Sequence, residues 1–241
     1  EAALCASLGM DLVITDHHEC KDQLPPAIAV VDPPRPDDRY PHKTLSGVGV
    51  AFKLAAALCG SQELVLRSYA DMVCLGTVAD VMPLQGENRV FVSRGLQLLQ
   101  HSTRPGIVAL MKECGCAPAD VSAASIGFML APRINAAGRM GKIELAIELF
   151  LTKDAERATY LAKALCDLNK KRQEIEAEIY RQAVEMLEEE KDQISVNPKV
   201  VQKYLGAVRY LRDMPEKAPK VGVVNGLAYT TVGGETLAVE C

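Results

Sequence analysis

The sequence lacks the features that mark membrane and secreted proteins. None of its apolar runs approaches the ~18 residues of a membrane-spanning helix, so we expect no membrane partner. No secretory leader is recognisable, which predicts a cytoplasmic protein. The eight cysteines are scattered, and the one close pair, Cys114 and Cys116, has too short a spacing for a zinc knuckle. We therefore expect reduced thiols rather than a disulfide framework.

The sequence also lacks an excess of charge of either sign. Lys and Arg total 27, and Asp and Glu total 31, which gives a formal net charge of −4. No strong overall field therefore attracts nucleic acid, and any DNA contact must come from a local basic patch. The 241 residues, 49% of them hydrophobic, are enough for one sizeable core and allow two domains.

The sequence does contain an apolar run that stops abruptly at titratable residues. Residues 12–15 predict a buried strand, and Asp16, His17, His18 and Glu19 follow directly. In an open parallel sheet, ligands bind just beyond the carboxyl ends of the strands. Imidazole nitrogens and carboxylate oxygens suit Mn, Zn or Fe, so the pattern indicates a metal centre. On the paired histidines alone, a polar surface turn is an equally good interpretation.

The rest of the chain mixes predicted helices and strands. A helix over 1–9 and a second buried strand over 27–31 indicate an α/β, doubly wound parallel sheet. Asp32, Asp37 and Asp38 follow that strand and are interpreted as turn-forming acids, with a position near the metal as the alternative. The other predicted helices cover 51–58, 63–75, 88–99, 105–114, 122–130 and 152–190, and two short strands, 221–224 and 237–239, flank a Gly-rich turn.

Two further stretches have the chemistry of a ligand site. Asp80 has apolar neighbours on both sides, and a buried acid is costly to leave unpaired, so a metal would stabilise it; a helix cap or turn is the alternative. Arg133 and Arg139 bracket Asn135 and Gly138 in a predicted loop. The planar fork of Arg fits phosphate, and glycine allows close backbone approach. Two solvated arginines on a surface loop are an equally good interpretation.

Four stretches, in order along the chain, resemble motifs of the DHH phosphoesterase family. Residues 16–18 are the Asp-His-His triplet itself, and residues 40–54 resemble the segment that follows it. Residues 76–84 (GTVADVMPL) resemble the fourth motif, in the form used by the family's single-strand-specific exonucleases. Residues 131–140 (APRINAAGRM) resemble the arginine-bearing loop of the same group. The resemblance covers about residues 1–192.

This resemblance implies a metal-dependent 5′–3′ exonuclease that hydrolyses phosphodiester bonds of single-stranded DNA, in DNA repair and recombination. It implies Mn²⁺ or Mg²⁺ in a two-metal site, with His17 and Asp80 as ligands and Asp16 orienting them. A single-strand-binding protein is a further implied partner. The residues implied to contact the substrate phosphate or DNA are His18, Arg133, Asn135, Gly138 and Arg139.

The family's Asp-x-Asp motif and a further acid precede the DHH triplet and would lie before Glu1. We therefore expect a truncated sheet, an incomplete metal site and an isolated chain that is inactive. The long predicted helix carries charges on one face and a narrow apolar seam on the other. We accordingly divide the chain into a partial DHH phosphoesterase domain, a long interdomain helix and a small β-rich tail, over residues 1–150, 151–192 and 193–241.

The tail resembles a different family. Residues 226–235 (GLAYTTVGGE) are similar to the start of the Lon protease proteolytic domain. The catalytic Ser and Lys of that family lie further along than the matching stretch, so the resemblance implies no peptidase activity here. A Lon-type ATP-dependent serine protease remnant remains one alternative function. A DHH-family small-substrate phosphatase or pyrophosphatase is another, against which the two arginines argue.

Overall fold

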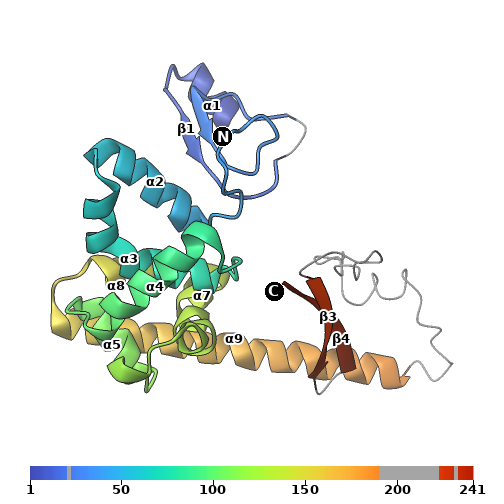
Figure 1. Ribbon diagram of the computed structural model, residues 1–241. Helices are drawn as coiled ribbons and strands as arrows, with labels where there is room; N and C mark the ends of the chain where they lie inside the picture. The colour runs from blue at the N-terminus through green and yellow to red at the C-terminus, as the bar shows by residue number, and fades with distance from the viewer. Residues whose placement is uncertain (21–22, 190–222, 231–232, 241) are drawn as a thin grey trace. The chain divides into compact units, whose positions relative to one another are not determined.

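The computed structural model describes residues 1–20, 23–189, 223–230 and 233–240, with side chains as far as Glu185 (Figure 1). The chain divides into two compact units, Glu1–Glu178 and Ile179–Cys241. No helix in the described part of the chain combines the length and the apolar character that crossing a membrane requires.

The first unit begins with a small parallel sheet, as predicted. Helix α1 (Ala2–Ser7) precedes β1 (Val13–Thr15), which pairs in parallel with β2 (Ala29–Val31). The prediction that both strands are buried was wrong, because Val13 is 55% exposed and Val31 is also exposed. Among the described elements, each of these strands pairs along one edge only. The exposure of Val13 shows that its face of this small sheet is not covered by another layer.

Two antiparallel helices connect this sheet to the rest of the unit. Helix α2 (Gly47–Cys59) is capped by Ser46, whose hydroxyl accepts from the Gly49 N–H at 3.2 Å, and α3 (Gln62–Ala79) follows after a left-handed Gly60. The two helices touch at Gly76, where a Cβ would lie 2.6 Å from Val48 Cγ1. The end of α3 is therefore held against the first turn of α2, close to β1.

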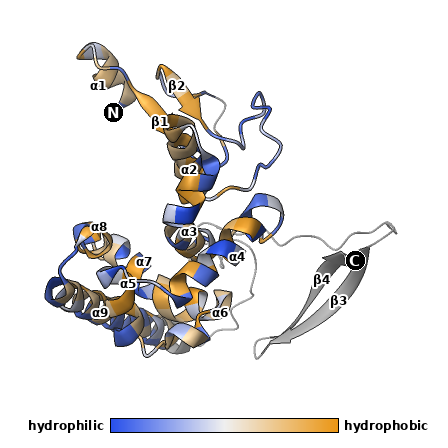
Figure 2. Ribbon diagram, turned by 60° about the vertical axis from the view of Figure 1, so that its left-hand side comes forward, coloured by the Kyte–Doolittle hydropathy of each residue, from blue (hydrophilic) through white to orange (hydrophobic). Residues whose placement is uncertain are grey.

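The main core lies among the helices that follow. Helices α4 (Gly86–Gln100), α5 (Pro105–Glu113), α8 (Ile143–Leu151) and α9 (Ala155–Glu189) complete it, together with α3. Figure 2 shows α5, α8 and α9 close together. Buried apolar side chains of these helices belong to one core cluster. The backbones approach closely, because a Cβ at Gly106 would lie 1.9 Å from the Leu149 carbonyl oxygen. Its largest fully buried side chains include Leu99, Ile107, Leu110, Ile126, Leu130, Leu149, Leu161 and Leu165.

The predicted arginine-bearing loop is helical. A short turn of α6 (Ala123–Ser125) runs into a π-helical turn, η2 (Ile126–Leu130), and then without a break into α7 (Ala131–Arg139). Pro132 is the second residue of α7. Because α7 follows η2 directly, this proline does not mark a break between helical and non-helical chain. Helix α8 was also missed, although Glu144 and Glu148 lie four residues apart in its otherwise apolar sequence, as expected for one face of a helix.

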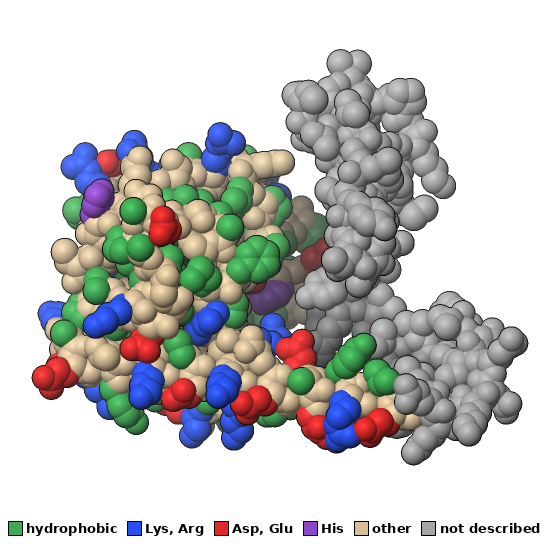
Figure 3. All heavy atoms as spheres, turned by 90° about the horizontal axis from the view of Figure 1, so that it is seen from below, with side chains coloured by type: hydrophobic (Ala, Val, Ile, Leu, Met, Phe, Trp, Pro, Cys, Tyr) green, Lys and Arg blue, Asp and Glu red, His purple; other side chains and the backbone are tan. Residues whose placement is uncertain are grey.

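Helix α9 confirms the predicted long helix, and its apolar seam is buried only in its first half. Leu161 and Leu165 are fully buried, whereas Ile175 and Ile179 are exposed. Acidic and basic side chains alternate along its solvent side (Figure 3), where Arg172 pairs with Glu176 four residues later.

The second unit contains an antiparallel hairpin. Strand β3 (Val223–Thr230) pairs with β4 (Gly233–Glu240), with Val223 opposite Glu240 and Thr230 opposite Gly233. The predicted strands were too short, because Gly226 lies within β3, opposite Leu237, rather than in a turn. Residues 221 and 222, which were part of the predicted first strand, lie outside the described residues.

Candidate metal centre

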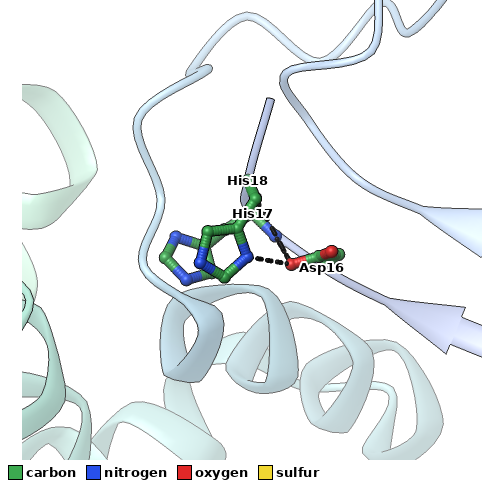
Figure 4. Close-up of side chains that lie close together, drawn as sticks. All are labelled: Asp16, His17 and His18. Atoms are coloured by element: carbon green, nitrogen blue, oxygen red, sulfur yellow. Dashed lines mark hydrogen bonds and ion pairs between the residues drawn. The ribbon is translucent and has the colours of Figure 1, made fainter. Parts of the chain in front are cut away.

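The Asp-His-His triplet forms a tight turn directly after β1. Asp16 Oδ1 accepts hydrogen bonds from the backbone N–H groups of His17 and His18, at 2.7 and 3.3 Å. The same oxygen lies 2.7 Å from His18 Nδ1 (Figure 4). Possible ligand atoms of all three side chains lie within 4.8 Å of one another. One carboxylate therefore fixes the backbone of the turn and the direction of one imidazole.

The electrostatics of this turn follow from the Asp16–His18 hydrogen bond. Partial burial alone would raise the pKa of Asp16, but the hydrogen bonds from His18 and the two backbone N–H groups outweigh it and lower that pKa. The same hydrogen bond raises the pKa of His18, and the negative charge of Asp16 adds to this shift. The pair is therefore stabilised as carboxylate and imidazolium.

The His17 imidazole lies beside that of His18, with the ring centroids 4.2 Å apart, and also reaches the helices. It packs on the first turn of α2, where a Cβ at Gly47 would lie 3.2 Å from His17 Cδ2 (Figure 4). Its Nδ1 lies 3.4 Å from Asp80 Oδ2, at the end of α3. That separation is longer than an ordinary hydrogen bond between nitrogen and oxygen. Two predicted site residues, 63 positions apart in sequence, thus converge on one point.

Asp80 is not the buried acid that the sequence predicted. Its side chain is 43% exposed, and the residue ends α3, donating its N–H to the Gly76 carbonyl at 3.0 Å. The next residue, Val81, has φ +54°, a left-handed conformation that β-branched residues rarely adopt. This turn reverses the chain directly after Asp80, and the Asp80 carboxylate stays at the helix end, facing His17.

Two hydroxyls hold the helix ends in place, a role that no pattern in the sequence indicated. Ser46, the cap of α2, and Thr77, in the last turn of α3, are both buried, and their hydroxyl oxygens lie 3.0 Å apart. This hydrogen bond joins the start of α2, which supports His17, to the end of α3, which carries Asp80. Only the contact between the two helices reveals it.

The His17–Asp80 pair has the geometry of two donors to one ion. Ligand atoms about 2.0–2.2 Å from a shared metal lie about 3 Å apart at right angles and about 4 Å apart when opposite. The observed 3.4 Å falls between these limits. One imidazole nitrogen with a carboxylate oxygen also matches the preferences of Mn²⁺. The residues present therefore fit a divalent metal.

Of the five residues predicted to contact phosphate or DNA, His18 lies in the turn after β1, and the other four lie on α7 and separate into two groups. Asn135 and Arg139, four residues apart on one face, both line a hollow of about 450 Å³. Asn135 also lines an adjoining hollow of about 280 Å³, together with Asp80. Gly138 is exposed, and a Cβ there would meet only Ile143 Cδ1, at 3.9 Å.

Arg133, by contrast, turns away from both hollows. Its Nη1 donates to the Phe128 carbonyl at 3.4 Å, and its buried Nε has no partner among the described residues. Arg133 and Arg139 thus differ in their surroundings, although the sequence treats them as a pair. The i, i+4 spacing of Asn135 and Arg139 would have predicted this division if the segment had been recognised as a helix.

Asp32 is more deeply placed than a turn-forming acid. It is only 2% exposed, and its Oδ2 accepts the Cys20 thiol at 2.8 Å, which with burial raises the pKa of that thiol to about 11. Its Oδ1 is buried without a partner among the described residues. Asp32 lines a hollow of about 320 Å³ with Asp16 and His18, which places it near the turn.

Comparisons with known proteins identify relatives of two segments of this chain. Residues 1–77 match the DHH family, N-terminal domain, and residues 195–241 match the Lon protease (S16) C-terminal proteolytic domain. The single-stranded-DNA-specific exonuclease RecJ of Bacillus subtilis is 41% identical over 192 residues, which cover 79% of this chain and 24% of that protein. RecJ of Escherichia coli is 37% identical over 195 residues, covering 76% of this chain and 34% of that protein.

Solved structures show the same relationship. The crystal structure of RecJ in complex with Mn²⁺ from Thermus thermophilus superposes with a TM-score of 0.64 at 37% identity, over 75% of this chain and 28% of that one. Residues 1–77 of this chain therefore belong to the DHH family. Within that family, the relatives that the chain matches are RecJ exonucleases. The chain spans about a quarter to a third of the length of these curated relatives.

Proposed function

We propose that this chain carries part of the catalytic site of a metal-dependent 5′–3′ exonuclease that hydrolyses phosphodiester bonds in single-stranded DNA, in DNA repair and recombination. The observation that supports it most directly is the convergence of His17 and Asp80, with 3.4 Å between Nδ1 and Oδ2. The relatives are named single-stranded-DNA-specific exonucleases, and one solved relative holds Mn²⁺.

In this proposal, His17 and Asp80 hold Mn²⁺ or Mg²⁺, and Asp16 fixes the turn that aims His17. A pair of divalent ions, when bound, supplies an activated water and offsets the charge that develops on the phosphate. Gly47 keeps the imidazole of His17 at its place against α2. The Ser46–Thr77 hydrogen bond keeps Asp80 opposite it.

The remaining site residues would position the DNA. The exposed ring of His18, held by Asp16, faces solvent beside the metal ligands. Asn135 and Arg139 offer donors that no described residue uses, on a surface that continues to Asp80. Gly138 leaves space for the strand. The family resemblance implies that the Arg133 guanidinium would donate to a phosphate oxygen.

The proposal extends to the organisation of the chain and its setting. Residues 1–150 would form the DHH phosphoesterase domain, residues 151–192 the interdomain helix and residues 193–241 a Lon-like tail. A single-strand-binding protein is the proposed partner, and the cytoplasm the proposed location. The domain division and the partner follow from the resemblance of these segments to their families, and the location follows from the scattered cysteines, which predict reduced thiols.

A cleavage assay with protein in excess tests the reaction. We expect the isolated chain to have little or no activity, so protein is used in excess. With Mn²⁺, any residual activity should shorten a 3′-labelled single strand from its 5′ end and leave a duplex intact. His17→Ala should abolish shortening, and His101→Ala, which replaces an exposed histidine at the C-cap of α4, should not.

Other substrates separate the alternatives. Hydrolysis of pyrophosphate with DNA untouched would favour a small-substrate phosphatase, and degradation of casein would favour the Lon-type protease. If no substrate is turned over, Mn²⁺-dependent binding of the single strand becomes the test. Loss of that binding in His17→Ala supports the proposal, and binding without any Mn²⁺ dependence contradicts it.

A further inference from the structure

Phe128 stands apart from the other phenylalanines. It is 82% exposed, whereas Phe52 and Phe91 are buried and Phe150 is partly buried against the main core. It lies in the π-helical turn η2, directly before α7. Such turns are rare and often occur at functional sites, because the extra residue pushes a side chain outward. An aromatic ring held in solvent on an ordered turn is available to a ligand.

Phe128 lines the hollow of about 450 Å³ that also contains Asn135 and Arg139. Val81, which is itself 87% exposed, belongs to the same apolar lining, together with Val78, Ala131 and Pro132. A hollow of this size has room for a small ligand such as one nucleotide. The exposed side chains of Phe128 and Val81 form an apolar surface that suits the flat face of one ring of a ligand.

The other wall of this hollow is positively charged. Arg172, on α9, lines it and is held in place by Asn169 at 3.2 Å and Glu176 at 2.8 Å. Arg139 has no hydrogen-bond or ion-pair partner in the described part of the chain. No acidic residue of that described part lines the hollow. An apolar face next to two guanidinium groups is complementary to a nucleotide, with its flat base and charged phosphate.

The hollow is continuous with the candidate metal centre. Ala79 and Asn135 line both this hollow and the adjoining one that contains Asp80. Val81 follows Asp80 directly in the chain. A nucleotide seated against Phe128 would therefore lie next to the phosphate held at His17 and Asp80.

We propose that Phe128 is a stacking platform for one base of the single-stranded DNA, with Arg139 and Arg172 contacting the adjacent phosphate. This inference rests on the proposed function and adds a specific position where the strand is gripped by its base. Stacking accepts any base, because every base has a π-face, so this contact favours single strands without selecting sequence. Paired bases in a duplex are already stacked and cannot insert.

Photo-crosslinking tests the contact directly. The full chain is mixed with single-stranded oligonucleotides that carry 5-iodouracil at one position at a time, then irradiated and mapped by mass spectrometry. We expect a crosslink to the peptide that contains Phe128 from one or two neighbouring positions only. Crosslinks confined to other peptides would overturn the inference while leaving DNA binding, and hence the proposed function, intact. No crosslink and no DNA binding would overturn both.

Binding measurements supply the matched variants. Phe128→Ala should weaken binding of a fluorescent single strand on the order of tenfold, and Phe128→Trp should retain it. Tyr160→Ala removes an exposed aromatic on α9 that does not line the hollow, and should bind like the unchanged chain. An abasic residue at the crosslinked position should abolish the difference between Phe128→Ala and the unchanged chain. Equal losses on intact and abasic strands would contradict stacking.

Discussion

Two regions of the first unit differ in how they treat their apolar side chains. The helices between residues 45 and 178 enclose them, with Leu161 and Leu165 fully buried. The sheet segment before residue 33 exposes them, with Val13 more than half exposed. The less protected region nevertheless carries the Asp-His-His turn. The candidate metal centre therefore joins the two regions, because His17 follows the exposed strand, rests on α2 and faces Asp80 at the end of α3.

The largest expected effect separates these two regions by stability. Leu161→Ala should lower the free energy of unfolding by about 2–5 kcal/mol, because it leaves a cavity in a packed core. Val13→Ala should change it by about 0.5 kcal/mol or less, because the side chain is already largely hydrated. Urea unfolding followed by circular dichroism measures both. Equal losses would show that the sheet contributes to the same core as the helices.

The second effect concerns the contact that joins the regions. Gly47→Ala should place a methyl group 3.2 Å from the His17 ring and turn it away from Asp80. We expect Mn²⁺ affinity to fall on the order of tenfold, as for other changes that misalign a ligand. The free energy of unfolding should stay the same or rise slightly, because alanine favours helix. Calorimetric titration and urea unfolding give the two quantities.

The neighbouring glycine of α2 provides the control. In Gly49→Ala, the added methyl group would meet Leu45 and Ser46 at an ordinary 3.4 Å, away from His17. This variant should therefore bind Mn²⁺ as the unchanged chain does. If both glycine variants lose affinity equally, the effect comes from α2 as a whole and not from the His17 contact.

A smaller, pH-dependent effect on stability is expected at Glu87, in the first turn of α4, where the segment between β2 and α2 contacts the helices through Tyr40. Burial alone would raise the pKa of Glu87, but hydrogen bonds from Lys53 and the Tyr40 hydroxyl outweigh it and lower that pKa below 4.5. This contribution to stability is complete above pH 4.5 and is lost as the pH falls through the folded-state pKa. In Glu87→Gln, the stability curve should therefore be flatter below that pH.

Urea unfolding at a series of pH values measures this difference. Glu63→Gln, which replaces an exposed acid in an ion pair with Arg67, is the control and should change the slope much less. The prediction fails if the Glu87→Gln and unchanged curves stay parallel from neutral pH to the acid limb.

Local sequence patterns predicted where helices and strands form better than they predicted which side chains of these elements are buried. The strand ending at Thr15 and the long helix after residue 152 were confirmed, because a β-branched run and a regular apolar seam are local signals. The exposure of Val13 could not be predicted, since it depends on which neighbours cover the sheet. The helix over Ala131–Arg139 was missed because Pro132 and Gly138 suggested a loop. In the structure, the helical turn η2 continues directly into α7 despite these two residues.

For the candidate site, the sequence identified residues but not their relations. Asp16, His17, His18 and Asp80 were found through motif resemblance, and the structure brings His17 within 3.4 Å of Asp80. The reason given for Asp80 was wrong, because the acid is partly exposed and gains its importance from His17. Ser46 and Thr77 could not have been singled out, since their burial and their mutual contact arise from elements distant in the sequence. Asp32 was named, but a position near the metal was only the alternative to a turn-forming acid.

One double-mutant cycle tests the central claim that His17 and Asp80 hold the same ion. Mn²⁺ dissociation constants are measured by calorimetry for the unchanged chain, His17→Ala, Asp80→Ala and the double variant, with circular dichroism to verify that each is folded. The account predicts that each single variant loses most of the affinity and that the double variant loses far less than the product of the two factors. If the two losses multiply, the residues act at separate places and the shared metal centre is contradicted.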